Sequence, residues 1–251
     1  TYGERIVLRL LDKQSAQINI NDLGLPQTIL STYKKSLSES EGIILVTGPT
    51  GSGKTTTLYA GLRDLSDSSQ NILTVEDPIE YTLKGIGQTQ VNQKTGYSFA
   101  TGLRAMLRQD PDVVMVGEIR DTETAQIAIQ SSLTGHLVLS TVHTNSAVGA
   151  ITRLRDMGIE SFLISSSLKT VISQRLVRRL CDSCKVKTTI NKDIADLFGL
   201  KHNLEVYDHV GCDDCNGTGY KGRIAVAECV NVDKTIKAVS YTHLTLPTKF
   251  V

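Results

Sequence analysis

The stretch Gly48-Pro49-Thr50-Gly51-Ser52-Gly53-Lys54-Thr55 decides the fold of this chain of 251 residues. It lies between an apolar run at residues 43–46, which we expect to be a strand, and a helix-like run at residues 56–65. A strand, a glycine-rich loop and a helix in this order are typical of a phosphate-binding P-loop. Because glycine turns tightly, the loop can aim successive N–H groups at densely packed phosphate oxygens. The sequence therefore predicts a site for a nucleoside triphosphate.

Two side chains at the end of the loop complete the expected phosphate site. Lys54 is expected to reach the β- and γ-phosphates, and the Thr55 hydroxyl to complete the shell of a Mg²⁺ ion. The helix that starts near Lys54 adds the positive end of its dipole. A solvent loop of small residues is the alternative. The expected nucleotide-binding residues are Gly48, Pro49, Thr50, Gly51, Ser52, Gly53, Lys54, Thr55 and Thr56.

Composition limits the class of protein. The chain is 40% apolar, enough for a real core, and its 27 Lys and Arg nearly balance 26 Asp and Glu. No global basic field therefore points to nucleic acid as a partner. No apolar window approaches the roughly 18 residues that span a bilayer, and no signal-peptide pattern is present, so we expect membrane contact to be peripheral. Because the chain starts without Met and in mid-strand, we expect it to be a piece of a longer protein.

Alternating strands and helices predict an α/β protein with a doubly wound sheet. Apolar runs at residues 71–75, 113–116 and 137–142 read as buried strands, with helices between them. Residues 85–97 are expected to form a hairpin or a loop. The helices are expected at residues 27–37, after Ser98, from Asp121 or Thr122 to Gly135, at 146–157 and at 161–180.

The ends of the chain read differently from its middle. Residues 3–11 alternate as a strand that places Arg5 and Arg9 on one face, where they could reach a neighbouring subunit's phosphate as arginine fingers. We expect residues 1–24 to be the end of a preceding domain and a linker. Residues 25–237 are the expected nucleotide-binding domain, and residues 238–251 an irregular tail.

Carboxylates follow two of the expected strands. Glu118, after residues 113–116, can hold a water in line with the γ-phosphate and accept its proton. Gly117 occupies the place where the common pattern has a metal-binding Asp. A salt-bridged surface glutamate is the alternative for Glu118. Glu76, Asp77 and Glu80 follow residues 71–75, where they are expected to organise metal and water, with a solvated turn as the alternative.

Two histidines flank the expected strand at residues 137–142. His136 and His143 lie at its opposite ends, so both cannot touch one phosphate directly. Imidazole can donate a hydrogen bond to a phosphate oxygen and report its loss. We expect these histidines to act as γ-phosphate sensors, with a structural role as the alternative, more so for His136.

Four cysteines predict a metal site. Cys181 and Cys184, and after 27 residues Cys212 and Cys215, form two CxxC pairs. Two such turns supply the four thiolates of a closed structural zinc site, which has no open position for catalysis. Free or redox-active cysteines are the alternative. We expect this zinc-binding insertion at residues 181–215, and Cys229 in the core.

Three arginines end the expected helix at residues 161–180. Arg175, Arg178 and Arg179 read as a solvated face or as helix C-terminal charges. A contact with acidic phospholipid headgroups is the alternative.

Together these motifs resemble the secretion ATPases of type II secretion and type IV pilus assembly. The resemblance covers about residues 3–237. It rests on six motifs: GPTGSGKTTT (48–57), TVEDPIEY (74–81), LRAMLRQDPDVVMVGEIRD (103–121), TGHLVLSTVHTN (134–145), LCDSC (180–184) and CDDCNGTGYKGR (212–223).

This resemblance implies a RecA-like core in a homo-hexamer at the cytoplasmic face of the inner membrane, where ATP hydrolysis acts through a membrane platform protein. It also implies that Lys54 and Thr55 stand for the family's Walker A residues, and Glu118 for Walker B. The acidic box corresponds to Glu76, Asp77 and Glu80, and the histidine box to His136 and His143. The tetracysteine element looks like the assembly and secretion branch rather than pilus retraction. We expect the family's N-terminal platform-binding domains to lie outside the given sequence, and residues 239–251 to depart from its closing helix.

Two other functions compete with an ATPase motor. RecA-like cores also move DNA, so a nucleic-acid translocase with a structural zinc module is the alternative. It predicts a basic stripe and steeply salt-dependent binding, and the near-neutral composition offers no obvious stripe. A GTP switch is disfavoured because no Asn-Lys-x-Asp motif is present.

Overall fold

The computed structural model describes residues 3–4, 6, 18–66 and 69–233. The chain divides into two compact units, which we call the larger unit (Thr1–Arg175 with Val226–Val251) and the smaller unit (Leu176–Ala225). The expected strand with Arg5 and Arg9 and the tail at 238–251 lie outside the described residues.

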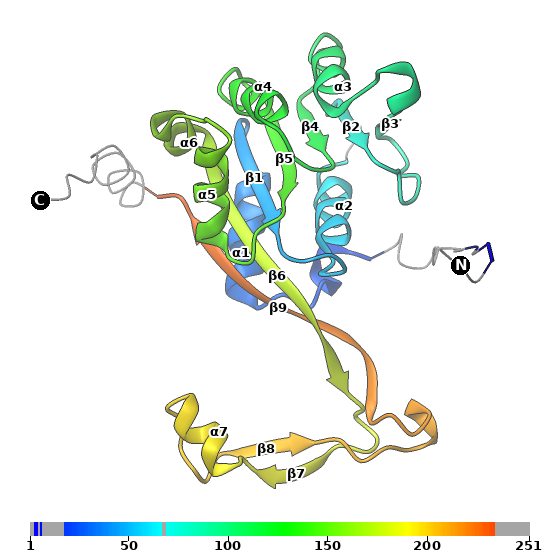
Figure 1. Cartoon of the computed structure of the whole chain (residues 1–251), viewed down its shortest axis with the longest axis vertical. Coiled ribbons are helices and arrows are strands. Elements are labelled where there is room, and N and C mark those ends of the chain that lie inside the picture. Colours follow the sequence, from blue (N-terminus) through cyan, green and yellow to red (C-terminus); the bar gives the residue numbers. More distant parts are fainter. Residues whose placement is uncertain (1–2, 5, 7–17, 67–68, 234–251) are drawn as a thin grey trace, which may run out of the picture. The chain divides into compact units, whose positions relative to one another are not determined.

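A seven-stranded sheet with the order β3-β2-β4-β5-β1-β6-β9 runs through the chain (Figure 1). The pairs β1–β5, β1–β6, β2–β3, β2–β4 and β4–β5 are all parallel. The strands are β1 (Gly42–Thr47), β2 (Ile72–Glu76), β3 (Gly87–Gln90), β4 (Val113–Val116), β5 (Leu137–Val142), β6 (Leu168–Leu180) and β9 (Tyr220–Asn231). The main helices are α1 (Gln27–Leu37), α2 (Lys54–Leu65), α3 (Phe99–Met106), α4 (Thr122–Ser132), α5 (Ala147–Asp156) and α6 (Ser161–Ser167).

The central strands β1, β4 and β5 are buried on both faces of the sheet. Successive strand residues point to opposite faces, so Ile43 and Leu45 join one apolar cluster while Ile44 and Val46 join the other. Helices α1 and α2 pack on the Ile44 side, and α3, α4, α5 and α6 on the Ile43 side. This arrangement confirms the α/β class and the doubly wound, mostly parallel sheet expected from the sequence.

The segment at residues 161–180 corrects the expected single helix. Helix α6 ends at Ser167, and β6 begins at the next residue. The hydroxyl of Ser166 donates to the Phe162 carbonyl and that of Ser167 to the Leu163 carbonyl, within the last turn. Residues 170–174 are buried on both faces of the sheet, so the alternation that marks a strand is lost from the sequence. Arg175, Arg178 and Arg179 therefore lie on a strand and do not end a helix.

Residues 85–97 also differ in part from expectation. Strand β3 pairs in parallel with β2 at the edge of the sheet, so it is not one arm of a hairpin. A short antiparallel bridge then joins Asn92 to Tyr97. Helices α3 and α4 begin where the sequence predicts them. Ser98 caps α3 by accepting from the Thr101 amide, and Asp121 caps α4 by accepting from the Thr124 amide.

The smaller unit has its own two-stranded sheet. Strands β7 (Val186–Thr189) and β8 (Glu205–Asp208) pair antiparallel, with helix α7 (Lys192–Leu197) between them in the chain.

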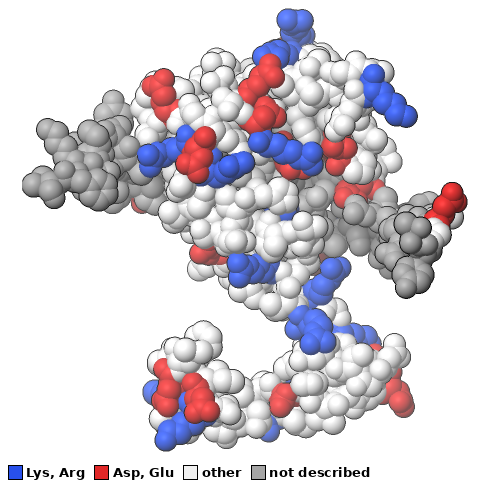
Figure 2. All heavy atoms as spheres, in the orientation of Figure 1, with Lys and Arg blue, Asp and Glu red and all other residues white. Residues whose placement is uncertain are grey.

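On the face of the larger unit in Figure 2, acidic and basic side chains are interspersed and form no basic stripe. Among the described residues, no helix combines the length and apolar character needed to cross a membrane.

Candidate nucleotide site and cysteine cluster

The P-loop connects the end of β1 to the start of α2, as the sequence predicts. Gly48 has φ +137°, and an added Cβ would lie 2.2 Å from the backbone oxygen of Gln174. Gly53 has φ +85° as the residue before α2. Both positions need glycine, because other L-residues rarely adopt this backbone conformation.

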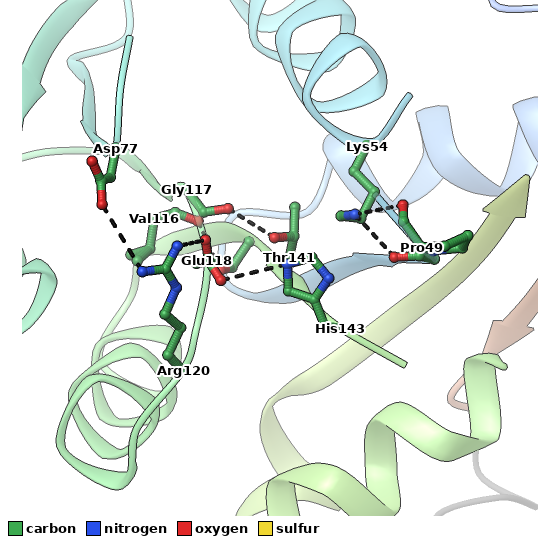
Figure 3. Close-up of polar contacts among 11 residues, drawn as sticks. Pro49, Lys54, Asp77, Val116, Gly117, Glu118, Arg120, Thr141 and His143 are labelled. Carbon is green, nitrogen blue, oxygen red and sulfur yellow. Dashed lines mark hydrogen bonds and ion pairs between the residues drawn. The ribbon is translucent and has the colours of Figure 1, made fainter. Parts of the chain in front are cut away.

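Lys54 folds over its own loop. Its Nζ donates to the carbonyl oxygens of Gly48 at 2.9 Å and Pro49 at 3.0 Å (Figure 3). Desolvation by burial lowers the pKa of Lys54, and the negative charge of Glu118 opposes that shift. Lys54 follows β1 and Glu118 follows β4, and the parallel strands β4, β5 and β1 end at the same edge of the sheet.

Gln174, on β6, holds the P-loop through side-chain hydrogen bonds. The sequence alone did not predict this role. This residue is only 2% exposed. Its Nε2 donates to the Ser52 carbonyl at 2.7 Å, and its Oε1 accepts from the Thr57 hydroxyl at 2.9 Å. The only sequence signal for this role is a single glutamine in a mostly apolar run, and that run, at residues 161–180, predicts a helix.

The residues around the loop fit a bound triphosphate with Mg²⁺. Among the described residues, the buried side-chain hydroxyls of Thr47 and Ser52 have no hydrogen-bond partner, and both belong to this strand-loop-helix unit. Buried polar groups normally have partners, so unpaired ones call for an explanation. A phosphate-bound metal ion and its waters would supply one.

Four charged or polar side chains gather where the parallel strands end (Figure 3). Nη2 of Arg120 donates to Oε1 of Glu118, and Nη1 lies 3.9 Å from Oδ2 of Asp77. His143 places Nε2 at 3.5 Å from the other oxygen of Glu118. The ends of β2, β4 and β5 thus contribute to one chain of contacts, Asp77–Arg120–Glu118–His143, which we call the strand-end group.

Backbone contacts fix the segment that carries Glu118. The Thr141 hydroxyl donates to the Gly117 carbonyl at 2.8 Å, and the Ile119 amide donates to the Thr141 carbonyl at 2.9 Å. The Glu118 side chain is 15% exposed. Glu118 is therefore a partly buried carboxylate that pairs with charged side chains at the edge where the parallel strands end.

Arg120 was not singled out from the sequence. Its hydrogen bond to Glu118 raises the pKa of its guanidinium, and the nearby charge of Asp77 adds to this. The guanidinium also lies over the Phe99 ring, 5.9 Å from its centroid. The only available signal was the motif Gly117-Glu118-Ile119-Arg120, whose spacing alone does not say that residues i and i+2 will pair.

The acidic box does not act as one cluster. The residue Glu76 is only 3% exposed, and its carboxylate accepts from three side-chain donors, Tyr59, Thr74 and Gln88. Asp77, in contrast, reaches toward Arg120 in the strand-end group. The backbone amide of Glu80 donates to the Tyr59 hydroxyl at 3.4 Å.

The two histidines are at opposite ends of β5, as predicted. His143 belongs to the strand-end group. His136 precedes β5, and its Nδ1 lies 3.0 Å from the Ser131 carbonyl oxygen at the end of α4. The structure thus brings only His143 together with Glu118.

The four predicted metal ligands lie together in the smaller unit. Their sulfurs are all within 4.8 Å of one another, with Cys181–Cys212 and Cys184–Cys215 at 3.8 Å and Cys212–Cys215 at 3.7 Å. A tetrahedral zinc ion with Zn–S bonds of about 2.3 Å holds its sulfurs about 3.8 Å apart. The sulfur of Cys215 also accepts from the amides of Cys212 and Gly219. The donor set and spacing therefore fit a Cys₄ zinc site.

Two of the three arginines of β6 have partners within the smaller unit. The Arg178 guanidinium lies 4.0 Å from the centroid of the Tyr220 ring, and Arg179 pairs with Asp182. The contact with acidic phospholipid headgroups stays a prediction. Arg175 is exposed on the strand.

The chain is similar to a known protein family and to curated members of it. A family model described as "Type II/IV secretion system protein" matches residues 1–246. Among curated relatives, the putative type II secretion system protein E of Escherichia coli (strain K12) is 59% identical over 97% of this chain. The type II secretion system ATPase E of Vibrio cholerae is 57% identical over 97% of it. The matches cover 50% and 49% of these relatives, so the chain spans about half their length.

Solved structures give the same fold. The pilus retraction motor PilT with bound ADP aligns with a TM-score of 0.67 and 32% identity, over 90% of this chain and 57% of that one. The ATPase DotB of Legionella pneumophila aligns with a TM-score of 0.62 and 26% identity, over 88% and 53%. The VirB11 ATPase of Brucella suis, at a TM-score of 0.55 over 94% and 60%, is 21% identical and supports the fold alone.

Proposed function

The chain belongs to the type II/IV secretion system protein family, and on this premise we propose that it is the ATP-hydrolysing part of a motor for type II secretion or type IV pilus assembly. The observation that carries the proposal is the strand-end group, which lies at the same edge of the parallel sheet as the P-loop that follows β1. A P-loop alone binds a triphosphate, whereas a carboxylate at a neighbouring strand end can activate a water.

Each residue has a distinct task in this proposal. The P-loop amides and Lys54 bind the phosphates, and Thr55 holds Mg²⁺ with help from Asp77 and Glu80 through waters. Glu118 orients the attacking water and accepts its proton, while His143 donates to the γ-phosphate. Mg²⁺, when bound, neutralises charge on the β- and γ-oxygens. The contact of His136 with Ser131 favours its structural alternative.

The test of the nucleotide function is hydrolysis and binding by the purified chain. We expect Mg²⁺-dependent release of phosphate from ATP, and loss of ATP binding in Lys54→Ala. Lys35→Ala is the matched control, since Lys35 is an exposed lysine on α1. A chain that binds no ATP, or a Lys54→Ala variant that binds as the parent does, would contradict the proposal.

We further propose that Cys181, Cys184, Cys212 and Cys215 bind one structural zinc ion. Elemental analysis should find one zinc per chain, and Cys184→Ser should lose it. Cys229→Ser is the control, because Cys229 packs beside the Ile44 cluster, where burial raises the pKa of its thiol to about 11. Well-folded chain free of metal would overturn this assignment.

The proposed assembly follows the family. It is a homo-hexamer at the cytoplasmic face of the inner membrane that works through a membrane platform protein, with Arg5 and Arg9 as fingers to a neighbouring subunit's nucleotide. On the face of the larger unit that Figure 2 shows, the interspersed charges offer no basic stripe for nucleic acid. DNA binding that falls steeply with salt would favour the nucleic-acid translocase instead.

A further inference from the structure

Buried side chains on two elements hold the segment that follows β2. The Glu76 carboxylate, buried at the start of this segment, accepts from the Tyr59 hydroxyl of α2 at Oε2. Its Oε1 accepts from the Thr74 hydroxyl at 2.5 Å and from Nε2 of Gln88, on β3, at 3.0 Å. Both carboxylate oxygens are therefore occupied by neutral donors.

Tyr59 makes two further contacts with the same segment. Its hydroxyl oxygen accepts from the backbone amide of Glu80 at 3.4 Å, and its ring meets the Tyr81 ring edge-on, with centroids 4.7 Å apart. Desolvation by burial, together with the bond to Glu76, raises the pKa of Tyr59. The hydroxyl thus keeps its proton and remains a donor to Glu76.

Strand β3 holds the other side of the segment. The Gln88 side chain donates to the Tyr81 carbonyl at 3.2 Å and accepts from the Leu83 amide at 2.6 Å. Gln90 accepts from the Ile79 amide at 3.3 Å. The glutamine side chains of β3 thus hold three backbone groups within residues 79–83: the amides of Ile79 and Leu83 and the carbonyl of Tyr81. Strand β3 itself belongs to none of the nucleotide motifs.

Tyr59 is placed to connect this segment to the P-loop helix. Thr55 and Tyr59 are four residues apart on α2, so they share one face of the helix. We propose that Tyr59 is a positioning residue that, anchored on Glu76 and assisted by Gln88, sets Asp77 and Glu80 relative to the Mg²⁺ ion at Thr55. This inference rests on the proposed function, since it assumes that Asp77 and Glu80 organise metal and water. It also gives buried Glu76 a role that needs no contact with the ion.

The decisive variant is Tyr59→Phe, which keeps the ring and removes the hydroxyl. We expect kcat to fall about tenfold, because displacement of a catalytic group by 1 Å can cost up to 10²-fold. The Mg²⁺ concentration for half-maximal rate should rise about fivefold, while affinity for ATP without Mg²⁺ should stay within about twofold, since the P-loop is untouched.

The matched control is Tyr33→Phe. Tyr33 is also fully buried against α2, and its hydroxyl donates to the Thr57 carbonyl at 3.1 Å, outside the acidic box. A loss of helix packing alone would affect both variants alike, whereas the proposal predicts a changed Mg²⁺ dependence only in Tyr59→Phe. An unchanged Mg²⁺ dependence in Tyr59→Phe, or an equal change in Tyr33→Phe, would overturn it.

Gln88→Met tests the same assembly from β3. It preserves volume and removes the hydrogen bonds to Glu76, Tyr81 and Leu83, so we expect the Mg²⁺ shift to recur. If Tyr59→Phe does not fold, Gln88→Met decides, and a parental Mg²⁺ dependence in it refutes the proposal. Failure of the parent chain to bind ATP would instead contradict the proposed function, so the two failures are distinguishable.

Discussion

Glu76 and Glu118 stand at the ends of neighbouring parallel strands, yet their surroundings differ. Glu76 is the last residue of β2 and keeps the facing of Thr74 two residues earlier, which turns it into the buried side of the sheet toward α2. Glu118 comes two residues after β4, beyond the ladder, and pairs with Arg120 and His143. A carboxylate whose strand still sets its direction is thus buried among neutral donors, whereas one beyond the strand pairs with charged side chains. Under the proposed function, the first is an anchor and the second a reactive group.

The largest effect should come from Glu118→Gln. The substitution keeps the shape but removes the proton acceptor, so we expect hydrolysis to fall about 10²- to 10⁴-fold, as for loss of a general base. ATP binding should persist because the P-loop is intact. Single-turnover hydrolysis and equilibrium binding measure the two effects, and near-parental turnover would remove Glu118 from its proposed role.

Glu76→Gln should reverse that pattern. The new amide nitrogen would face a donor among Tyr59, Thr74 and Gln88, and a buried mismatch of this kind costs about 1–3 kcal/mol. We expect urea unfolding to show this loss for Glu76→Gln and little change for Glu118→Gln. If Glu76→Gln is as stable as the parent and as inactive as Glu118→Gln, the distinction between anchor and reactive group fails.

The smallest effect concerns pH. Nucleotide binding needs cationic Lys54, so it should weaken as pH rises through the pKa of Lys54, which burial lowers. The charge of Glu118 raises that pKa, so Glu118→Gln should move the alkaline loss of ATP binding to lower pH.

Binding curves across alkaline pH measure this shift. Glu123→Gln is the control, because Glu123 is an exposed residue of α4 that pairs with Arg104. An alkaline limb that stays in place or moves upward in Glu118→Gln would show that the two side chains do not interact.

Much of the fold could be predicted because its signals are local. The P-loop, the apolar strands β1, β4 and β5 and the caps at Ser98 and Asp121 each depend on a short pattern. Strand β6 could not be predicted this way, since burial on both faces removes its alternation and its Leu and Arg residues also suit a helix.

The site residues also divide into those that a local sequence pattern predicts and those that it does not. The P-loop residues have fixed spacings, and so do the four cysteines. The members of each set could therefore be predicted to lie close to one another. The partners of Glu118 and Glu76, however, come from other elements, as with Arg120, Tyr59 and Gln88. Gln174 meets the P-loop only because β6 lies beside β1. Such pairings depend on sheet order and strand register, which no local pattern contains.

The complete burial of β1 has a consequence for motion. All six of its residues are buried, and it lies between β5 and β6 in the sheet. Amides in such a central strand exchange with solvent only when the whole domain opens. We therefore expect hydrogen exchange to be slowest in β1, immediately before the P-loop. The phosphate-binding loop is thus rooted in the part of the domain least free to move, and it can serve as a fixed reference against which other segments shift during a catalytic cycle.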